Sequence, residues 1–234
     1  MRILAIETSC DETAVAFIEA RGGLKKPRFN VLKNEVSSQI ELHRPYGGVE
    51  PGLARREHIK NLPAVCASVV GEKDWKDIDA IAITVGPGLE IALWAGIDFA
   101  KSLAQKYRKP LLGANHLEGH LYSPLLSLKE KARNPKLPAI GLVVSGGHTI
   151  LIVLESMDKW KKIGETKDDA VGEAFDKVAR LLGFPYPGGP EIQRVAEKGD
   201  ANSIDFPRPM LNQKNFDFSF SGLKTSVLYY LRGK

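Results

Sequence analysis

Residues 3–18 read ILAIETSCDETAVAFI, and residues 140–154 read IGLVVSGGHTILIVL. Each stretch is an apolar run, then a short polar loop that ends in threonine, then a second apolar run. This is the pattern of two strands joined in a hairpin. The first loop, residues 7–13, carries three carboxylates and three hydroxyls. The same unit occurs twice, and an internal duplication is the simplest explanation.

Repeated strand, loop and strand units facing one another across a cleft are the plan of the actin-like, sugar-kinase-like ATPases. We therefore expect an α/β protein with an actin-like ATPase fold of two duplicated lobes, residues 1–137 and residues 138–234. The charged, proline-containing stretch 129–138 is the expected connector. The first lobe has a further strand at 79–85 that runs into a glycine turn. The second lobe has no counterpart of this strand and turn. We therefore expect the second lobe to be incomplete, as in a C-terminally truncated protein.

Glycine-rich loops follow several of the predicted strands. Gly146 and Gly147 let a backbone approach a phosphate because no Cβ intervenes. Gly86-Pro87-Gly88 precedes a predicted helix over 90–107, so this turn is either an anion site at a helix N-terminus or a tight strand-to-helix connection. The acidic loop 7–13 has two interpretations as well: a phosphate and metal loop, or a solvated polar hairpin.

The remaining helices follow from periodicity. Residues 53–70 form an amphipathic helix with Leu62, Val65 and Val69 on its buried face. Residues 168–182 form another, with Asp168 and Asp169 in its first turn, where the helix dipole favours acids. Asp176 in its middle is either an exposed acid or a ligand contact. Further helices are expected at about 191–198 and, as a short helix that follows Lys224, through Leu231.

His116 and His120 are four residues apart and would lie on one face of a helix, where they could share a metal ion. Zinc peptidases carry their general base directly after the first histidine. Glu118 lies two places after His116, about 200° around the helix, so it points away from the shared face. Two histidines fill only half of a metal's shell. The alternative is a helix with two surface histidines and no metal.

Composition narrows the class of protein. The chain has 234 residues, 43% of them hydrophobic, which is enough for a buried core. We find neither a run of about 20 apolar residues nor a signal peptide, and therefore predict a cytoplasmic protein with no membrane partner. Cys10 and Cys66 form no metal-like pair. The net charge is +5, and its basic residues cluster at 25–28, 55–58, 106–109 and 129–136, which could neutralise phosphates or be ordinary solvated faces.

Eight short motifs occur in order along nearly the whole chain. They are Thr8–Thr13, Tyr46–Val49, Gly86–Leu89, His116–His120, Val144–Thr149, Gly172–Lys177, Pro187–Pro190 and Phe218–Lys224. Together they resemble the tRNA adenosine threonylcarbamoyltransferase family, formerly described as glycoproteases. The resemblance implies transfer of threonylcarbamoyl from its adenylate to the exocyclic N6 amine of the adenosine just 3′ of the anticodon, in tRNAs that read codons beginning with A, with release of AMP.

The resemblance also implies site residues and cofactors. His116 and His120 would bind one divalent metal, iron with zinc as the alternative. The nucleotide, as threonylcarbamoyl-AMP or as ATP or AMP, would be held by Val143, Val144, Ser145, Gly146, Gly147, Asp176, Gly189 and Gln193. Asp11 and Glu12 match the acidic pair of the first loop, and one of them could assist deprotonation of the attacking amine.

The resemblance further implies tRNA, a paralogous actin-like subunit, a small P-loop ATPase and a threonylcarbamoyl-AMP synthase as partners. This sequence departs from the family's pattern at several positions. The family's remaining metal-ligating aspartate and a nucleotide-contacting asparagine would lie beyond Lys234. Glu50, Gly52, Glu90 and Ile91 also differ from the family's usual residues, which bears on the surface of the first lobe. The alternatives are a non-catalytic scaffold paralogue, a metallopeptidase, or a sugar or acetate kinase of the same superfold.

Overall fold

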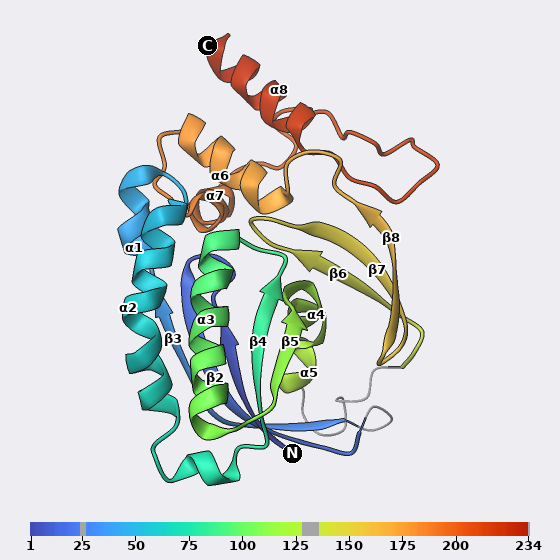
Figure 1. The fold of residues 1–234 in the computed structure, drawn as a ribbon. Helices are drawn as coiled ribbons and strands as arrows, with labels where there is room; N and C mark the ends of the chain where they lie inside the picture. Colours follow the sequence, from blue (N-terminus) through green and yellow to red (C-terminus); the bar gives the residue numbers. More distant parts are fainter. Residues whose placement is uncertain (24–26, 128–135, 234) are drawn as a thin grey trace. The chain divides into compact units, whose positions relative to one another are not determined.

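The computed structural model describes residues 1–23, 27–127 and 136–233. The chain divides into two compact units, the first formed by Met1–Glu41 and Val49–Pro135, the second by Leu42–Gly48 and Lys136–Lys234. Figure 1 labels the elements of both. The segment Leu42–Gly48, which the sequence-based division places in the first lobe, belongs to the second unit.

The first unit contains a five-stranded sheet of order β3-β2-β1-β4-β5. Its strands are β1 (Arg2–Glu7), β2 (Glu12–Arg21), β3 (Arg28–Ser38), β4 (Ala80–Gly86) and β5 (Leu111–Asn115). β1 and β2 are the predicted hairpin, paired antiparallel from Arg2 with Glu19 to Glu7 with Ala14. β4 runs parallel to both β1 and β5. The carboxyl ends of β1, β4 and β5 therefore meet at one edge of the sheet.

Two long helices, α2 (Pro51–Val69) and α3 (Glu90–Tyr107), lie side by side across one face of this sheet (Figure 1). Alternate residues of β1, β2 and β4 point toward them and form the core, together with Leu62, Cys66 and Val69 of α2. Gly96 lets α3 approach the sheet closely, since a Cβ there would stand 2.3 Å from the Thr8 hydroxyl. The short helices α4 (His116–Tyr122) and α5 (Pro124–Ser127) follow β5, and the 3-10 turn η2 (Asp74–Asp77) precedes β4.

The second unit contains a three-stranded antiparallel sheet of order β6-β7-β8. Its strands are β6 (Ala139–Val144), β7 (Thr149–Ser156) and β8 (Lys159–Glu165). The helices are α6 (Val171–Leu181), α7 (Gly188–Ala196) and α8 (Ser221–Arg232), with the 3-10 turn η1 (Arg44–Tyr46). α1 (Ile40–His43) spans the change from one unit to the other. β6 and β7 are the second predicted hairpin, so the α/β class and the repeated hairpin are confirmed.

One helix begins later than predicted. α6 starts at Val171, so Asp168 and Asp169 lie before the helix and not in its first turn. Asp168 instead accepts hydrogen bonds from Ser219 Oγ at 2.5 Å and from Phe220 N at 2.8 Å, just before α8. Asp169 pairs with Lys177 and Lys224, each at 2.8 Å. The two acids therefore tie the start of α8 to α6. No helix in the described part of the chain combines the length and apolar character that a membrane span requires.

Candidate functional site

The histidine pair lies on α4, a helix of seven residues. Asn115 caps it, because its side-chain oxygen accepts hydrogen bonds from Leu117 N at 2.9 Å and Glu118 N at 3.2 Å. The spacing places both rings on one face, with ring centroids 4.4 Å apart and the two Nε2 atoms 3.0 Å apart. The predicted proximity of His116 and His120 is confirmed; their role as metal ligands stays a prediction.

Glu7, the last residue of β1, orients the first of these rings. Its Oε2 atom lies 3.3 Å from His116 Nδ1, and Ser9 Oγ lies 3.1 Å from the same nitrogen. Thr84 Oγ1 donates to Glu7 at 2.6 Å. Burial alone would raise the pKa of Glu7, but the hydrogen bonds with His116, Ser9 and Thr84 outweigh it and lower the pKa to about 2. Glu7 is therefore a carboxylate at neutral pH, and it fixes which ring nitrogen of His116 faces His120.

These residues suit a metal ion as a partial ligand set. Two imidazole nitrogens bound at about 2.1 Å and at a right angle on one ion stand about 3.0 Å apart, the separation that also suits a hydrogen bond between the rings. A carboxylate on the far nitrogen of a metal-bound histidine is the common outer-shell arrangement. Burial first, and then the charge of His116, lower the pKa of His120, which favours the neutral, metal-binding form. Within the described residues, no third His, Cys, Asp or Glu completes the set.

The acid loop, which we define as residues 8–12, runs from the end of β1 into the first residue of β2. Asp11 is buried, whereas Glu12 is half-buried. Burial first, and then the charge of Asp11, raise the pKa of Glu12 to about 7. The same two causes raise the pKa of Cys10 to about 12, so this thiol stays protonated at neutral pH. Glu12 thus has the proton affinity that a general base needs at physiological pH.

The glycine turn after β4 packs against this loop. A Cβ at Gly88 would lie 2.7 Å from the Ser9 carbonyl oxygen, so only glycine fits there without a shift. The next residue, Leu89, donates its backbone N–H to that carbonyl at 2.8 Å. The turn is thus a tight strand-to-helix connection that packs on the acid loop, and its role as an anion site stays a prediction.

The predicted nucleotide loop lies in the second unit, between β6 and β7. The Ser145 N–H donates to the His148 carbonyl at 2.9 Å, and the His148 N–H donates to Ser145 Oγ at 3.0 Å. A Cβ at Gly146 or Gly147 would meet nothing within 4 Å, so this stretch of backbone is open to an approaching group. Val143 is buried and Val144 is 53% exposed. Any contact of Val143 with a ligand is thus through its backbone.

Asp176 holds a turn together. Its Oδ1 accepts the Gly188 N–H at 2.7 Å, which joins α6 to the start of α7, where Gly189 and Gln193 follow. The carboxylate also lines a cavity of about 330 Å³ within the second unit. The other lining residues are Arg44, Pro45, Tyr46, Gly47, Arg180, Phe184, Pro185 and Tyr186. Arg44 Nε donates to the Tyr186 carbonyl at 3.1 Å, and Arg180 donates to the Gly47 carbonyl, so both arginines brace the walls.

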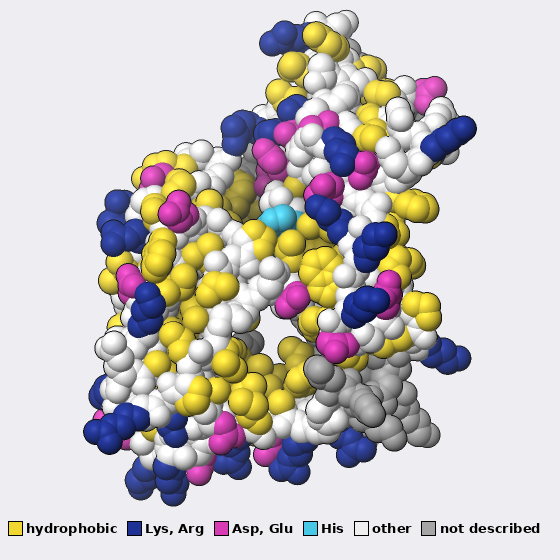
Figure 2. All heavy atoms as spheres, turned by 45° about the vertical axis from the view of Figure 1, so that its right-hand side comes forward, with side chains coloured by type: hydrophobic (Ala, Val, Ile, Leu, Met, Phe, Trp, Pro, Cys, Tyr) yellow, Lys and Arg dark blue, Asp and Glu magenta, His cyan; other side chains and the backbone are white. Residues whose placement is uncertain are grey.

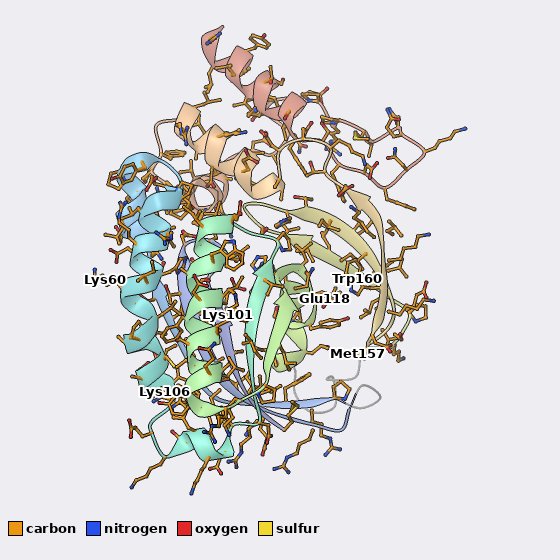
Figure 3. The ribbon with its side chains drawn as sticks, in the orientation of Figure 1. Lys60, Lys101, Lys106, Glu118, Met157 and Trp160 are labelled. Atoms are coloured by element: carbon orange, nitrogen blue, oxygen red, sulfur yellow. The ribbon has the colours of Figure 1, made fainter. Side chains whose placement is uncertain are left out.

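Figure 2 colours the Lys and Arg side chains dark blue, and on the face that it shows they lie among side chains of other types. Lys25 and Lys26, and the cluster from Lys129 up to Pro135, lie outside the described residues. In Figure 3, Lys60 extends from α2, while Lys101 and Lys106 belong to α3. The cluster 55–58 needs a correction: His58 is fully buried and is not part of a basic surface.

Sequence reasoning included Glu7 and Ser9 in the candidate acidic loop 7–13 but did not place them beside His116, and it did not single out Thr84. Glu7 and His116 are 109 positions apart, and no local period links them. The usable signal is topological, since each of Glu7, Ser9 and Thr84 lies at or just beyond the carboxyl end of β1 or β4, beside the end of β5.

Comparisons with known proteins agree with the predicted family. A family model described as tRNA N6-adenosine threonylcarbamoyltransferase matches residues 30–232. A protein of that name from Fervidobacterium nodosum is 47% identical over 99% of this chain and 66% of its own length. One from Thermosipho melanesiensis is 48% identical, over 99% and 68%. One from Albidiferax ferrireducens is 49% identical, over 97% and 63%. The chain spans about two thirds of the length of these curated relatives.

Solved structures give weaker likenesses. The Ppx/GppA enzyme of Aquifex aeolicus superposes with a TM-score of 0.45 at 12% identity, over 85% of this chain and 61% of the other. YeaZ from Pseudomonas aeruginosa gives a TM-score of 0.39 at 16% identity, over 69% and 63%.

Proposed function

The chain belongs to the tRNA N6-adenosine threonylcarbamoyltransferase family, and from this premise we propose that it transfers threonylcarbamoyl from threonylcarbamoyl-AMP to the N6 amine of the adenosine 3′ of the anticodon. The observation that carries the proposal is the family match over residues 30–232, which includes the histidine pair, the glycine loop and Asp176. The activity is a proposal for this chain because it spans only part of its relatives' length.

The reaction replaces one bond to the carbamoyl carbon by another. The adenosine amine nitrogen attacks this carbon, the bond from the carbon to the phosphate oxygen breaks, and AMP leaves with that electron pair. One proton leaves the amine. The mixed anhydride already has a good leaving group, so orientation and charge stabilisation are what the protein must supply.

We assign to Glu12 the role of the general base that accepts the proton from the attacking amine. A carboxylate with a pKa of about 7 is half ionised at neutral pH and can accept the amine's proton as the new bond forms. Asp11 is buried beside it and keeps that pKa raised through its charge. Asp11 is therefore assigned a tuning role, and Glu12 the direct one.

The glycine loop and Asp176 are assigned to the nucleotide. Backbone N–H groups at Gly146 and Gly147 are assigned to the phosphate of the leaving AMP, since both residues are exposed and carry no Cβ. Val144, Ser145, Gly189 and Gln193 are assigned to the same ligand, and Val143 to a backbone contact.

His116 and His120 are assigned to one divalent metal, which when bound would polarise the carbamoyl or phosphate oxygen as a Lewis acid. Their Nε2 atoms lie 3.0 Å apart, close enough to bind one ion, and the ion we propose is iron, with zinc as the alternative. Glu7 would hold His116 in the orientation that presents Nε2.

The partners we propose are those that the family resemblance implies. They are tRNA, a paralogous actin-like subunit, a small P-loop ATPase and the synthase that supplies the adenylate, all in the cytoplasm. The net charge of +5 is compatible with an RNA substrate.

The test is transfer of radiolabelled threonine, supplied as threonylcarbamoyl-AMP, into unmodified tRNA in the presence of the partner subunits. We expect label in the tRNA with the unaltered chain and a loss of about 100-fold or more with His116→Ala. Lys60→Gln on α2 is the matched control and should transfer normally. No label with the unaltered chain would overturn the proposal and leave the scaffold alternative.

A further inference from the structure

Three consecutive backbone carbonyls of the acid loop accept hydrogen bonds from other parts of the first unit. The donors are Leu89 N at 2.8 Å from the Ser9 oxygen, His58 Nε2 at 3.0 Å from the Cys10 oxygen, and Gln39 N at 2.9 Å from the Asp11 oxygen. They come from three separate parts of the first unit. Two are main-chain amides, which any residue except proline supplies. The middle contact alone depends on the identity of a side chain.

The His58 side chain is buried and makes its hydrogen bonds inside the first unit. It lies on α2 with no exposed surface, and Thr13 and Gln39, its polar neighbours, are 0% and 1% exposed. Thr13 Oγ1 is 2.7 Å from His58 Nδ1, and the Gln39 side-chain nitrogen is 3.4 Å from the same atom. A buried polar side chain in the core is retained only where its hydrogen bonds are made.

These partners fix the proton on the ring. A carbonyl oxygen can only accept, so Nε2 must carry the hydrogen that reaches Cys10. The Gln39 side-chain nitrogen can only donate, so the Nδ1 atom that faces it carries no hydrogen. In this neutral ring, Nδ1 accepts a hydrogen bond from the Thr13 hydroxyl. The ring is thereby a fixed brace between the start of β2 and the carbonyl of residue 10.

We propose that His58 is a positioning residue that sets the backbone of the acid loop, and through it the place of the Asp11 and Glu12 carboxylates in the transfer reaction. The inference rests on the proposed function, because those carboxylates matter only if transfer takes place there. His58 itself touches neither substrate nor reacting atoms.

The kinetic test compares two substitutions at this position. His58→Leu fills the space without hydrogen bonds, and His58→Gln restores an amide N–H that can reach the Cys10 carbonyl. We expect His58→Leu to lower kcat about 10- to 100-fold with KM for tRNA nearly unchanged, since small displacements of catalytic groups have this effect. His58→Gln should recover most of the loss.

Leu62→Ala is the matched control, one turn later on α2 and also in the core. It should lower Tm yet keep kcat at temperatures where the protein is folded. The proposal is overturned if Leu62→Ala lowers kcat as much as His58→Leu, or if His58→Leu keeps the kcat of the unaltered chain.

Two further readouts do not depend on transfer. Nitrogen-15 NMR of the histidine rings should give the Nε2–H tautomer for His58, and the Nδ1–H tautomer would contradict the contacts. Hydrogen exchange at residues 8–12 should accelerate in His58→Leu but not in Leu62→Ala. If the unaltered chain transfers nothing, the proposed function fails while these two measurements still decide whether His58 positions the loop.

Discussion

The partly buried carboxylate of Glu12 destabilises the folded protein when it is charged, and the same burial gives it the raised pKa that suits a general base. Its pKa rises from 4.5 to about 7 because burial and then Asp11 disfavour the charged form, with Glu7 adding a smaller charge effect. Between those two pH values the folded state binds more protons than the unfolded state, so stability falls as pH rises from 4.5 toward 7.

We therefore predict that Glu12→Gln stabilises the protein above neutral pH. At about pH 8 the gain should be about 1–2 kcal/mol, less than the full pKa shift implies because the side chain is half-buried, and it should vanish near the unfolded-state pKa. Urea unfolding of Glu12→Gln and of the unaltered chain at about pH 8 and near pH 4.5 measures the difference in their free energy of unfolding. Glu35→Gln on β3 serves as the control, and an equal gain there would show that net charge, and not burial, is responsible.

Both thiols should be inert in the folded protein. Burial, and then the charge of Asp11, raise the pKa of Cys10 to about 12, and burial raises that of Cys66 to about 11. Since only the thiolate reacts, we predict that a disulfide reagent at about pH 8 labels neither cysteine before unfolding. Both should be labelled in denaturant. Fast labelling of one thiol in the folded protein would contradict the raised pKa given to that residue.

At the scale of residues, the sequence predicts what lies within one turn or one loop. The spacing of His116 and His120 is sufficient to place them together. Glu7 and His58 reach their partners only through the sheet and the packing of α2, so no local pattern reveals which residues they contact. A usable signal did exist for His58: it is four residues before Leu62 and therefore falls on the buried stripe of the helix.

Among the elements, α4 is the one whose stability most directly concerns the site. A seven-residue helix is too short to persist without help, and Asn115 satisfies two of its first N–H groups. We predict that Asn115→Ala destabilises α4 by about 1 kcal/mol and weakens metal binding about fivefold.

Asn115→Asp keeps a capping oxygen and is the control. Metal affinity measured by competition with a chelating dye would test the prediction. Equal affinities for the two variants would mean that the cap has no part in ordering the histidines.

The bounds of elements were predictable where periodicity is strong. α3 begins and ends at the predicted residues, 90 and 107. α6 was placed too early because Asp168 and Asp169 resemble first-turn acids. Asp168 instead accepts hydrogen bonds at the start of α8, and Asp169 pairs with Lys177 on α6 and Lys224 on α8. β8 was not predicted, because its lysines interrupt the apolar alternation that marks a strand. Glu50 differs from the family's usual residue, and we expected this difference to bear on the surface of the first lobe. In the structure Glu50 is the N-cap of α2.

For the molecule as a whole, net charge is the property that bears on an RNA partner. We predict that raising NaCl from about 50 mM to about 200 mM weakens binding of the anticodon stem-loop about 10- to 20-fold, as expected when about three phosphates are neutralised. Fluorescence anisotropy of labelled RNA measures this. Affinity that does not depend on salt would contradict an electrostatic contribution to tRNA binding.

The fold class was predictable because the hairpin occurs twice, and a repeated unit outweighs ambiguity in any single strand. The assignment of Leu42–Gly48 to the second unit was not, since it depends on Arg44 and Gly47 meeting Tyr186 and Arg180, more than a hundred residues away.

The parallel register of β1, β4 and β5 limits how this protein can evolve. Glu7, Thr84 and His116 meet because three strands end in step, and side chains alternate between the two faces of a sheet. Removal of one residue of β4 before Thr84 would turn Thr84 to the opposite face. Lineages can therefore exchange residues at this edge, but insertions and deletions should be confined to the far ends of these strands.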